Sequence, residues 1–345
     1  MKLGRFIVDT HVHAQRHAAG KALKGSKDYS KLGHAMFHIE AYDNSPRLLY
    51  DMDCYDVDMC VLLPAFGMTN ELNLELVKKY PDKFIACCQA KTVRDKAMAG
   101  EITWTMDAAC EELDALLSTG NYVGIGECMP MPPDNPNLPN YEDRDERTII
   151  KDMMKVMDLA RKHGVSVRYH TGTPGGYAIP YHGFPATYNP LWAHTLATAY
   201  PDVPMVLEHG GIEGGWWEHF YDACLHVAAG HKNIYLETGR FWAELYYKAL
   251  NDPSVGAEKL LWGTDWGASL PVYVQPGRYP GGYTRQNIKE GIVRHQVDIW
   301  GWSLRQLQQL EISQDDLNLI LGGNAVRLYN LRTPGNLTRM FKFVD

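Results

Sequence analysis

The sequence has 345 residues, of which 45% are hydrophobic and 22% are charged, a composition typical of a folded globular protein. Its 34 Lys and Arg residues against 41 Asp and Glu residues give a net charge of −7, so a nucleic-acid partner is not expected. No run of about 18 apolar residues occurs, so neither membrane insertion nor export is expected. Seven cysteines without a CxxC pair are typical of reduced thiols, and we expect a cytoplasmic protein.

Short apolar segments rich in β-branched residues alternate with amphipathic segments along the whole chain. The predicted strands are Phe6–His11, Met59–Pro64, Phe84–Ala90, Val123–Glu127, Ser166–His170, Met205–His209, Ile234–Glu237 and Leu260–Gly263. The predicted helices are Leu72–Lys79, Ala108–Ser118, Thr148–His163, Pro190–Tyr200, Trp216–Ala229, Phe241–Leu250 and Ile288–Gln309. Eight strands separated by helical crossovers predict an α/β fold, specifically a (β/α)8 TIM barrel.

Three long segments interrupt this alternation, and each follows a predicted strand. They cover residues 14–47, which are rich in His and Lys, residues 129–147 and residues 270–285. In such a barrel these insertions lie on the C-terminal face, where loops carry function. Because no interdomain linker or repeat is found, we expect one domain over residues 1–331 and a C-terminal extension over residues 332–345.

Two histidines stand at the end of the first predicted strand, as Asp-Thr-His11-Val-His13. Alternation in a strand points positions i and i+2 to one face, so the two imidazoles converge. Such a pair suits a divalent metal, although an isolated HxH is equally well read as two hydrogen-bonded histidines at a strand end.

Further side chains that can bind metal stand where the later strands end. They are Glu127, His170, His209 and, just beyond the last strand, Asp265. In a barrel these positions meet at the C-terminal mouth, where active sites of this fold lie. Taken singly, Glu127 or Asp265 is also explained as a helix cap. Taken together, the six residues predict a metal site.

The HxH pair, the later single histidines and Asp265 resemble the amidohydrolase superfamily, and more narrowly its aminocarboxymuconate-semialdehyde decarboxylase-like branch, also called amidohydrolase-2. The segments at residues 201–211 (PDVPMVLEHGG), 260–265 (LLWGTD) and 320–331 (ILGGNAVRLYNL) carry the same resemblance, which spans residues 6 to about 331. It implies a metal-dependent TIM barrel that binds zinc, manganese or iron. The family contains hydrolases, decarboxylases, hydratases and a few oxygenases.

The resemblance leaves one or two ions per chain open. Mononuclear members commonly use the HxH pair, the strand-five His and the strand-eight Asp, whereas a carboxylate at the end of strand four bridges two metals elsewhere in the superfamily. By that correspondence one ion would be held by His11, His13 and Asp265, the other by His170 and His209, with Glu127 between them. With a single ion, His209 would be free to polarise the substrate.

The resemblance implies hydrolysis through a metal-activated water, with Asp265 as the acid and base, or decarboxylation with Asp265 protonating the carbon. The charge of the metals and their ligands favours a small carboxylate-bearing substrate, aromatic or not. Arg240 and Arg16 are candidate partners for its carboxylate, and Trp266 is a candidate lining residue. We expect a homo-oligomer or an assembly with a homologous subunit.

Two alternatives belong to other classes of function. The first is a dinuclear iron or manganese oxygenase that hydroxylates a small carboxylate or amino acid, which requires Glu127 as a bridging ligand. The second is a metal-binding structural partner subunit of a catalytic homologue. That alternative predicts missing ligands, and none of the six residues is missing.

Overall fold

The computed structural model describes residues 5–17, 41–65, 68–127, 130, 145–172, 189–212, 217–267 and 299–333. In this part of the chain eight parallel strands form one sheet in the order β1-β4-β5-β6-β7-β8-β9-β10. Backbone hydrogen bonds from Thr10 N to Trp262 O (2.9 Å) and from His13 N to Trp266 O (2.7 Å) join the last strand to the first. The predicted (β/α)8 TIM barrel is therefore confirmed.

The strands are short and buried. They are β1 (Val8–Val12), β4 (Met59–Leu62), β5 (Phe84–Cys88), β6 (Gly124–Ile125), β7 (Ser166–His170), β8 (Met205–Glu208), β9 (Ile234–Glu237) and β10 (Leu260–Leu261). A separate antiparallel pair, β2 (Gln15–His17) and β3 (Ala41–Asp43), follows β1.

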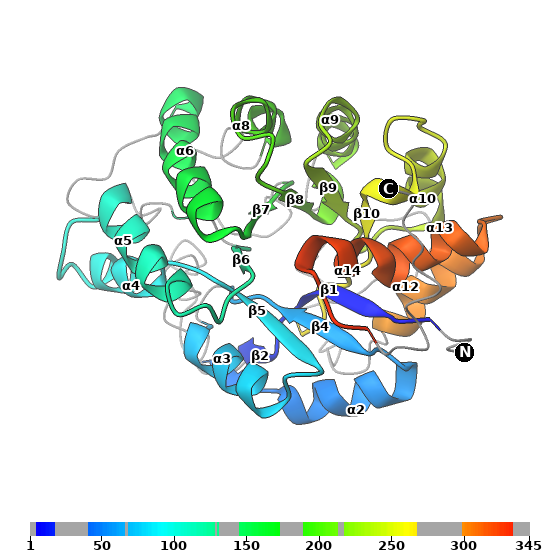
Figure 1. The fold of residues 1–345 in the computed structure, drawn as a ribbon, viewed down its shortest axis with the longest axis horizontal. Coiled ribbons are helices and arrows are strands. Elements are labelled where there is room, and N and C mark those ends of the chain that lie inside the picture. The colour runs from blue at the N-terminus through cyan, green and yellow to red at the C-terminus, as the bar shows by residue number, and fades with distance from the viewer. Residues whose placement is uncertain are drawn as a thin grey trace, which may run out of the picture.

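Helices surround the strands, with α6, α8 and α9 on one side of the barrel and α2 and α3 on the opposite side (Figure 1). The helices are α2 (Ser45–Tyr55), α3 (Asn70–Lys79), α4 (Lys91–Met98), α5 (Met106–Leu117), α6 (Glu146–His163), α8 (Ala193–Ala199), α9 (Trp217–Gly230), α10 (Ala243–Leu250), α12 (Ile299–Gln308), α13 (Gln314–Asn318) and α14 (Asn324–Tyr329). Short helical turns precede α8 (Pro190–Trp192), follow β8 (His209–Gly211) and precede β10 (Ala257–Lys259), and a π-helical turn (Leu319–Gly323) leads into α14.

The longest helix, α6, shows how the sequence sets its boundaries. The Asp145 carboxylate accepts a hydrogen bond from Thr148 N (2.8 Å) at the N-terminus. Gly164 ends the helix with a left-handed backbone (φ 64°), which glycine adopts without a steric penalty. Five buried apolar residues on one face then pack α6 onto the barrel.

The core has two layers, one between the strands and the helices and one inside the barrel. The inner layer includes Val8, Val61 and Val206, and α14 packs against it through Ala325. Phe6, just before β1, and Met59, the first residue of β4, belong to the same cluster, so α14 covers the N-terminal end of the barrel. The opposite, C-terminal end holds the predicted site.

Each predicted strand is present, but several are shorter than expected. The fourth ends at Ile125, and Gly126 after it has a positive φ of 131° while its N–H still donates to Cys88 O (2.9 Å). Helices α2, α4, α13 and α14 and the β2–β3 pair were not predicted. Most of the three insertions, residues 288–298 of the last predicted helix, and most of the C-terminal extension lie outside the described residues. The domain boundaries stay a prediction.

Within the described segments, no helix is both long enough and apolar enough to span a membrane.

Candidate metal centre

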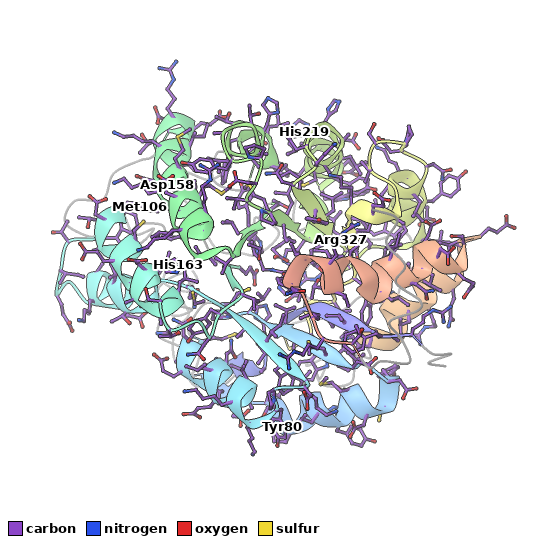
Figure 2. All side chains as sticks on the ribbon, in the orientation of Figure 1. Tyr80, Met106, Asp158, His163, His219 and Arg327 are labelled. Carbon is purple, nitrogen blue, oxygen red and sulfur yellow. The ribbon has the colours of Figure 1, made fainter. Side chains whose placement is uncertain are left out.

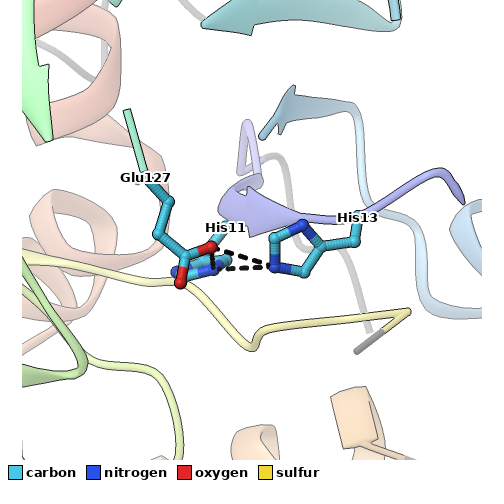
Figure 3. Close-up of side chains that lie close together, drawn as sticks. All are labelled: His11, His13 and Glu127. Carbon is cyan, nitrogen blue, oxygen red and sulfur yellow. Dashed lines mark hydrogen bonds and ion pairs between the residues drawn. The ribbon is translucent and has the colours of Figure 1, made fainter. Parts of the chain in front are cut away.

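The six predicted ligands converge at the C-terminal mouth of the barrel. They come from five segments of the chain: His11 and His13 from the end of β1, Glu127 after β6, His170 at the end of β7, His209 after β8, and Asp265 after β10. Figure 3 shows His11, His13 and Glu127 facing one another. Groups of three ligand atoms able to hold a metal ion are formed by His11, His13 and Glu127 and by Glu127, His170 and His209.

The protein fixes which ring nitrogen of each β1 histidine can bind a metal. His13 Nδ1 lies 2.8 Å from the carbonyl oxygen of Leu63, and His11 Nδ1 lies 2.9 Å from Glu208 Oε2. Both partners accept hydrogen bonds, so each Nδ1 carries the proton and donates it. In the neutral rings each Nε2 therefore keeps a lone pair, which is the form that coordinates metal.

The Nε2 atoms of His11 and His13 lie only 3.2 Å apart, and Glu127 Oε2 lies 3.2 Å from each of them. Three atoms with lone pairs thus face one another in a buried pocket, an arrangement that requires a cation or protons between them. Nitrogen and carboxylate donors suit zinc, iron and manganese. The residues present therefore fit a divalent metal.

Glu127 divides its two oxygens between two groups of histidines. Oε2 faces His11 and His13, whereas Oε1 lies 2.6 Å from His170 Nδ1 and 3.7 Å from His209 Nε2. A carboxylate placed in this way can bridge two ions. The geometry therefore agrees with the arrangement in which Glu127 stands between two metals.

Asp265 lies between a β1 histidine and a buried arginine. Its Oδ1 is 3.1 Å from His13 Nε2 and 3.6 Å from His11 Nε2, and its Oδ2 accepts a hydrogen bond from Arg240 Nη2. Burial alone would raise the pKa of Asp265, but the guanidinium of Arg240 and the two imidazoles outweigh this effect and lower it to about 2. Asp265 is thus held ionised.

The negative charge in the pocket raises the pKa values of the two β1 histidines, whereas positive charge lowers that of Asp265. Burial disfavours the charged form of His13, but hydrogen bonds to Asp265 and Glu127 raise its pKa to about 9. The pKa of His11 is raised against burial by Glu127, Glu208 and Glu237. With the histidines counted as neutral metal ligands, and with Asp9 left out because burial raises its pKa to about 7, the buried charged groups in and below the centre are the carboxylates of Glu127, Glu208, Glu237 and Asp265 and the guanidiniums of Arg168 and Arg240. This excess of two negative charges is what a divalent cation neutralises.

Three residues of the centre have left-handed backbones: His209 (φ 59°), Arg240 (φ 70°) and Asp265 (φ 57°). Each costs of order 1–3 kcal/mol in a residue other than glycine, and such positions gather at functional sites. The turns after β8, β9 and β10 thus point these side chains toward the barrel axis. The backbone strain of these turns would be absent from regular strands.

Two carboxylates beneath the ligands were not predicted as part of the site. Glu208 lies 2.9 Å and Glu237 lies 3.2 Å from His11 Nδ1, through Oε2 in both cases, and Glu237 Oε2 also accepts the backbone N–H of His209 (2.8 Å). Both are acidic residues at the end of a strand, like Glu127, and this position in the sequence is the feature that could have identified them as part of the site. Glu237 also belongs to a third group able to hold a metal, with His11 and His209.

The predicted substrate-binding residues lie in different places. Arg240 is inside the centre, on Asp265. Trp266 is buried, and its indole N–H donates to Asp51 on α2 (3.1 Å). The backbone of Arg16 lies in β2, and its side chain is outside the described atoms. The substrate contacts of all three stay predictions.

Comparisons with solved structures agree with the barrel fold. A probable 2-pyrone-4,6-dicarboxylic acid hydrolase from Acinetobacter baumannii, solved with citric acid bound, is similar at a TM-score of 0.53 and 15% identity, over 94% of this chain and 99% of that one. An amidohydrolase from Burkholderia multivorans with bound HEPES is similar at a TM-score of 0.52 and 12% identity, over 95% of this chain and 100% of that one. At these identities the likeness shows the fold alone.

No curated protein sequence matches the chain. The family model described as amidohydrolase, of the amidohydrolase-2 type, matches residues 8–331, which is nearly the whole chain. The chain belongs to the amidohydrolase family.

Proposed function

We propose that the protein is a metal-dependent hydrolase or decarboxylase of small carboxylate-bearing substrates, with His11, His13, Glu127, His170, His209 and Asp265 as the metal ligands. The observation that carries the proposal is the convergence of three atoms that can bind a metal, His11 Nε2, His13 Nε2 and Glu127 Oε2, within 3.2 Å of one another. A divalent cation held there supplies Lewis acidity, which acidifies water and polarises a carbonyl or carboxylate oxygen.

Asp265 is the residue we propose for proton transfer. Arg240 occupies Oδ2 and keeps the carboxylate ionised, which is the form that accepts a proton. Oδ1 faces the histidines and the ligand cluster, so we assign the proton to that atom. In hydrolysis Asp265 would pass the proton to the leaving group, and in decarboxylation it would deliver the proton to the carbon that loses carbon dioxide.

The number of ions affects the substrate class. With a single divalent ion, neutral histidines and Asp9 left out of the count because its pKa is raised to about 7, the four carboxylates and two guanidiniums leave the buried centre near neutral. With two ions and one hydroxide, the net charge is about +1, which attracts an anionic substrate. The carboxylate-bearing substrate is therefore better supported by a dinuclear centre, for which Glu127 is placed as the bridge.

The same bridge supports one second candidate, a dinuclear iron or manganese oxygenase. It is favoured by the separation of Glu127 Oε1 and Oε2 between the two histidine groups, because oxygen chemistry at a carboxylate-bridged pair needs both ions. It requires a redox-active metal, whereas the hydrolytic or decarboxylating function does not.

Metal analysis of protein purified without added metal, combined with anomalous scattering at the iron, manganese and zinc edges, tests these alternatives. Two ions per chain flanking Glu127 are expected. Zinc in both positions would exclude the oxygenase, and two ions including iron would favour it. Protein that binds no divalent metal even when it is supplied would overturn the proposal.

Matched variants separate the ligands from other histidines. His13→Ala is expected to lose metal, whereas His219→Ala, on the exposed surface of α9 (Figure 2), is expected to keep full metal content. Glu127→Ala with full metal content and activity would show that the bridging assignment is wrong. Asp265→Asn is then assayed on hydroxyaromatic acids for carbon dioxide release and on lactones and amides for ring opening or hydrolysis.

A further inference from the structure

Three buried side chains and the half-buried Tyr329 form a continuous line of hydrogen bonds from the N-terminal end of the barrel to the metal centre. Tyr329, on α14, accepts a hydrogen bond at its hydroxyl oxygen from Arg168 Nη1. Arg168 Nε donates to Glu208 Oε1 (2.5 Å) and Nη2 donates to Glu208 Oε2 (3.0 Å). Glu208 Oε2 then accepts the N–H of His11 Nδ1 (2.9 Å). We call these four residues the His11 support network.

Packing alone does not explain charged groups at these positions. Arg168 and Glu208 are fully buried on neighbouring strands, and the inner layer beside them contains apolar side chains such as Val206 and Leu261. Removing two charges from water is expensive, and buried ion pairs are often no more stabilising than apolar residues of the same volume. A role beyond stability is therefore the better account of this pair.

The network contacts the one atom that decides how His11 binds metal. A proton on Nδ1, held by Glu208, leaves Nε2 free and fixes the ring so that Nε2 faces His13 and Glu127. Glu237 Oε2 also reaches Nδ1, at 3.2 Å, but its shorter contact is to the backbone N–H of His209 (2.8 Å). Glu208 is the nearer acceptor, and the two-point contact with Arg168 holds its carboxylate in one orientation.

We propose that Arg168, Glu208 and Tyr329 are positioning residues that set the metal affinity of His11, and that α14 thereby acts on the centre from the opposite end of the barrel. This inference rests on the proposed function, because it takes His11 Nε2 as a metal ligand. None of the three side chains contacts substrate in this assignment.

Loss of a partner that holds a metal-binding histidine typically lowers metal affinity about 10–100-fold. Glu208→Gln alone would leave Arg168 buried without a counter-charge, so the paired variant Arg168→Gln/Glu208→Gln is the better test. It removes both charges together and keeps amide groups that can bond each other. Tyr329→Phe is the mildest change, because it removes a single hydroxyl.

The experiment measures the dissociation constant of Zn²⁺ by competition with a chromogenic chelator, and the visible absorption spectrum of the Co²⁺-loaded protein. The paired variant is expected to bind Zn²⁺ about 10–100-fold more weakly than the unchanged protein and to shift the Co²⁺ spectrum. Tyr329→Phe is expected to change both in the same direction by less. The control is Tyr221→Phe, which removes another buried hydroxyl, bonded to Leu245 O (2.5 Å), and is expected to change neither.

The outcomes separate this inference from the proposed function. If the unchanged protein binds neither Zn²⁺ nor Co²⁺, both fail. If it binds them and the folded paired variant has the same affinity and spectrum, the positioning role is wrong and the proposed function stands. If the paired variant does not fold, Tyr329→Phe decides: an affinity and a spectrum matching those of Tyr221→Phe overturn the inference.

Discussion

The Glu237 carboxylate occupies the space where a side chain at position 263 would lie. Gly263→Ala is therefore expected to disturb the metal centre, although Gly263 is not a proposed ligand. A Cβ at position 263 would lie 2.2 Å from Glu237 Oε1, 2.8 Å from its Cδ and 2.9 Å from its Cγ. The whole carboxylate would have to move, in a place where Glu237 is fully buried. The movement would break its contacts with the N–H of His209 and with His11 Nδ1.

The expected cost combines two effects. Overpacking of a buried site costs about 1–3 kcal/mol, and a hydrogen bond from a backbone N–H to a charged group contributes about 1.5–3 kcal/mol. Gly263→Ala should therefore lower the free energy of unfolding by about 2.5–6 kcal/mol. Gly230→Ala is the matched control, because a Cβ at the end of α9 meets nothing within 4 Å. That variant should be more stable by about 0.4–1 kcal/mol, since alanine restricts the unfolded chain.

Urea unfolding of the metal-free variants measures both effects, with the midpoint shifting and the slope unchanged. In a Glu237→Ala background the clash is gone, so Gly263→Ala should cost little there, and the two changes should be strongly non-additive. Two results would refute the reasoning: a Gly263→Ala protein within about 0.5 kcal/mol of the unchanged protein, or equal costs in the two backgrounds.

Three further predictions concern a buried pair of hydrogen bonds, a helix cap and the metal. Asn324→Ala should destabilise the protein by about 1–3 kcal/mol for each buried carbonyl that loses its partner, because its amide donates to two carbonyl oxygens at 2.7 Å; the urea midpoint checks this. Asp145→Ala should destabilise α6 at neutral pH. Because the hydrogen bond from Thr148 lowers the pKa of Asp145, the stability difference between the variant and the unchanged protein should vanish as pH falls through that lowered pKa, below about 3.9. Unfolding curves measured from pH 7 to 2 test whether this difference decreases with falling pH. Chelation of metal should lower the stability by about 2.7 kcal/mol relative to protein with free metal at 100 times its Kd, and Glu127→Ala should remove most of this difference, as thermal unfolding with and without metal would show.

Strand positions were predictable because buried parallel strands are continuous apolar segments with a clear contrast to the amphipathic helices. Helix α2 was missed although Pro46 stands at its start, because it follows directly on the polar insertion after β1. Helix α14 was missed because it follows a π-helical turn that contains two glycines, Gly322 and Gly323, which resemble a loop in sequence. A Cβ at Gly322 would lie 1.9 Å from the carbonyl oxygen of Phe6, so this glycine serves close packing.

The proposed ligands were predictable as residues at strand ends, whereas for Glu208 the alternation of side chains argued against that signal. In a regular strand His209 and its neighbour Glu208 point to opposite faces, so naming His209 as a ligand places Glu208 outside the barrel. In the structure β8 ends at Glu208, which faces inward, and the left-handed backbone of His209 turns its ring back to the same side. Irregular register between Asp9 and Val12 similarly lets both Val8 and His11 face inward.

These departures from strand geometry and the buried carboxylates have one physical connection. A left-handed backbone at His209 persists only when its surroundings hold it, and one contact that holds it is the hydrogen bond from its backbone N–H to Glu237. Glu237 also contacts His11 Nδ1, the same atom that donates to Glu208. Arg168 in turn holds the carboxylate of Glu208. The same carboxylates thus hold the backbone that presents one ligand and the ring that presents another. The affinity of the centre for metal should therefore depend on residues that never touch the ion, and a search for function restricted to ligand motifs would pass over them.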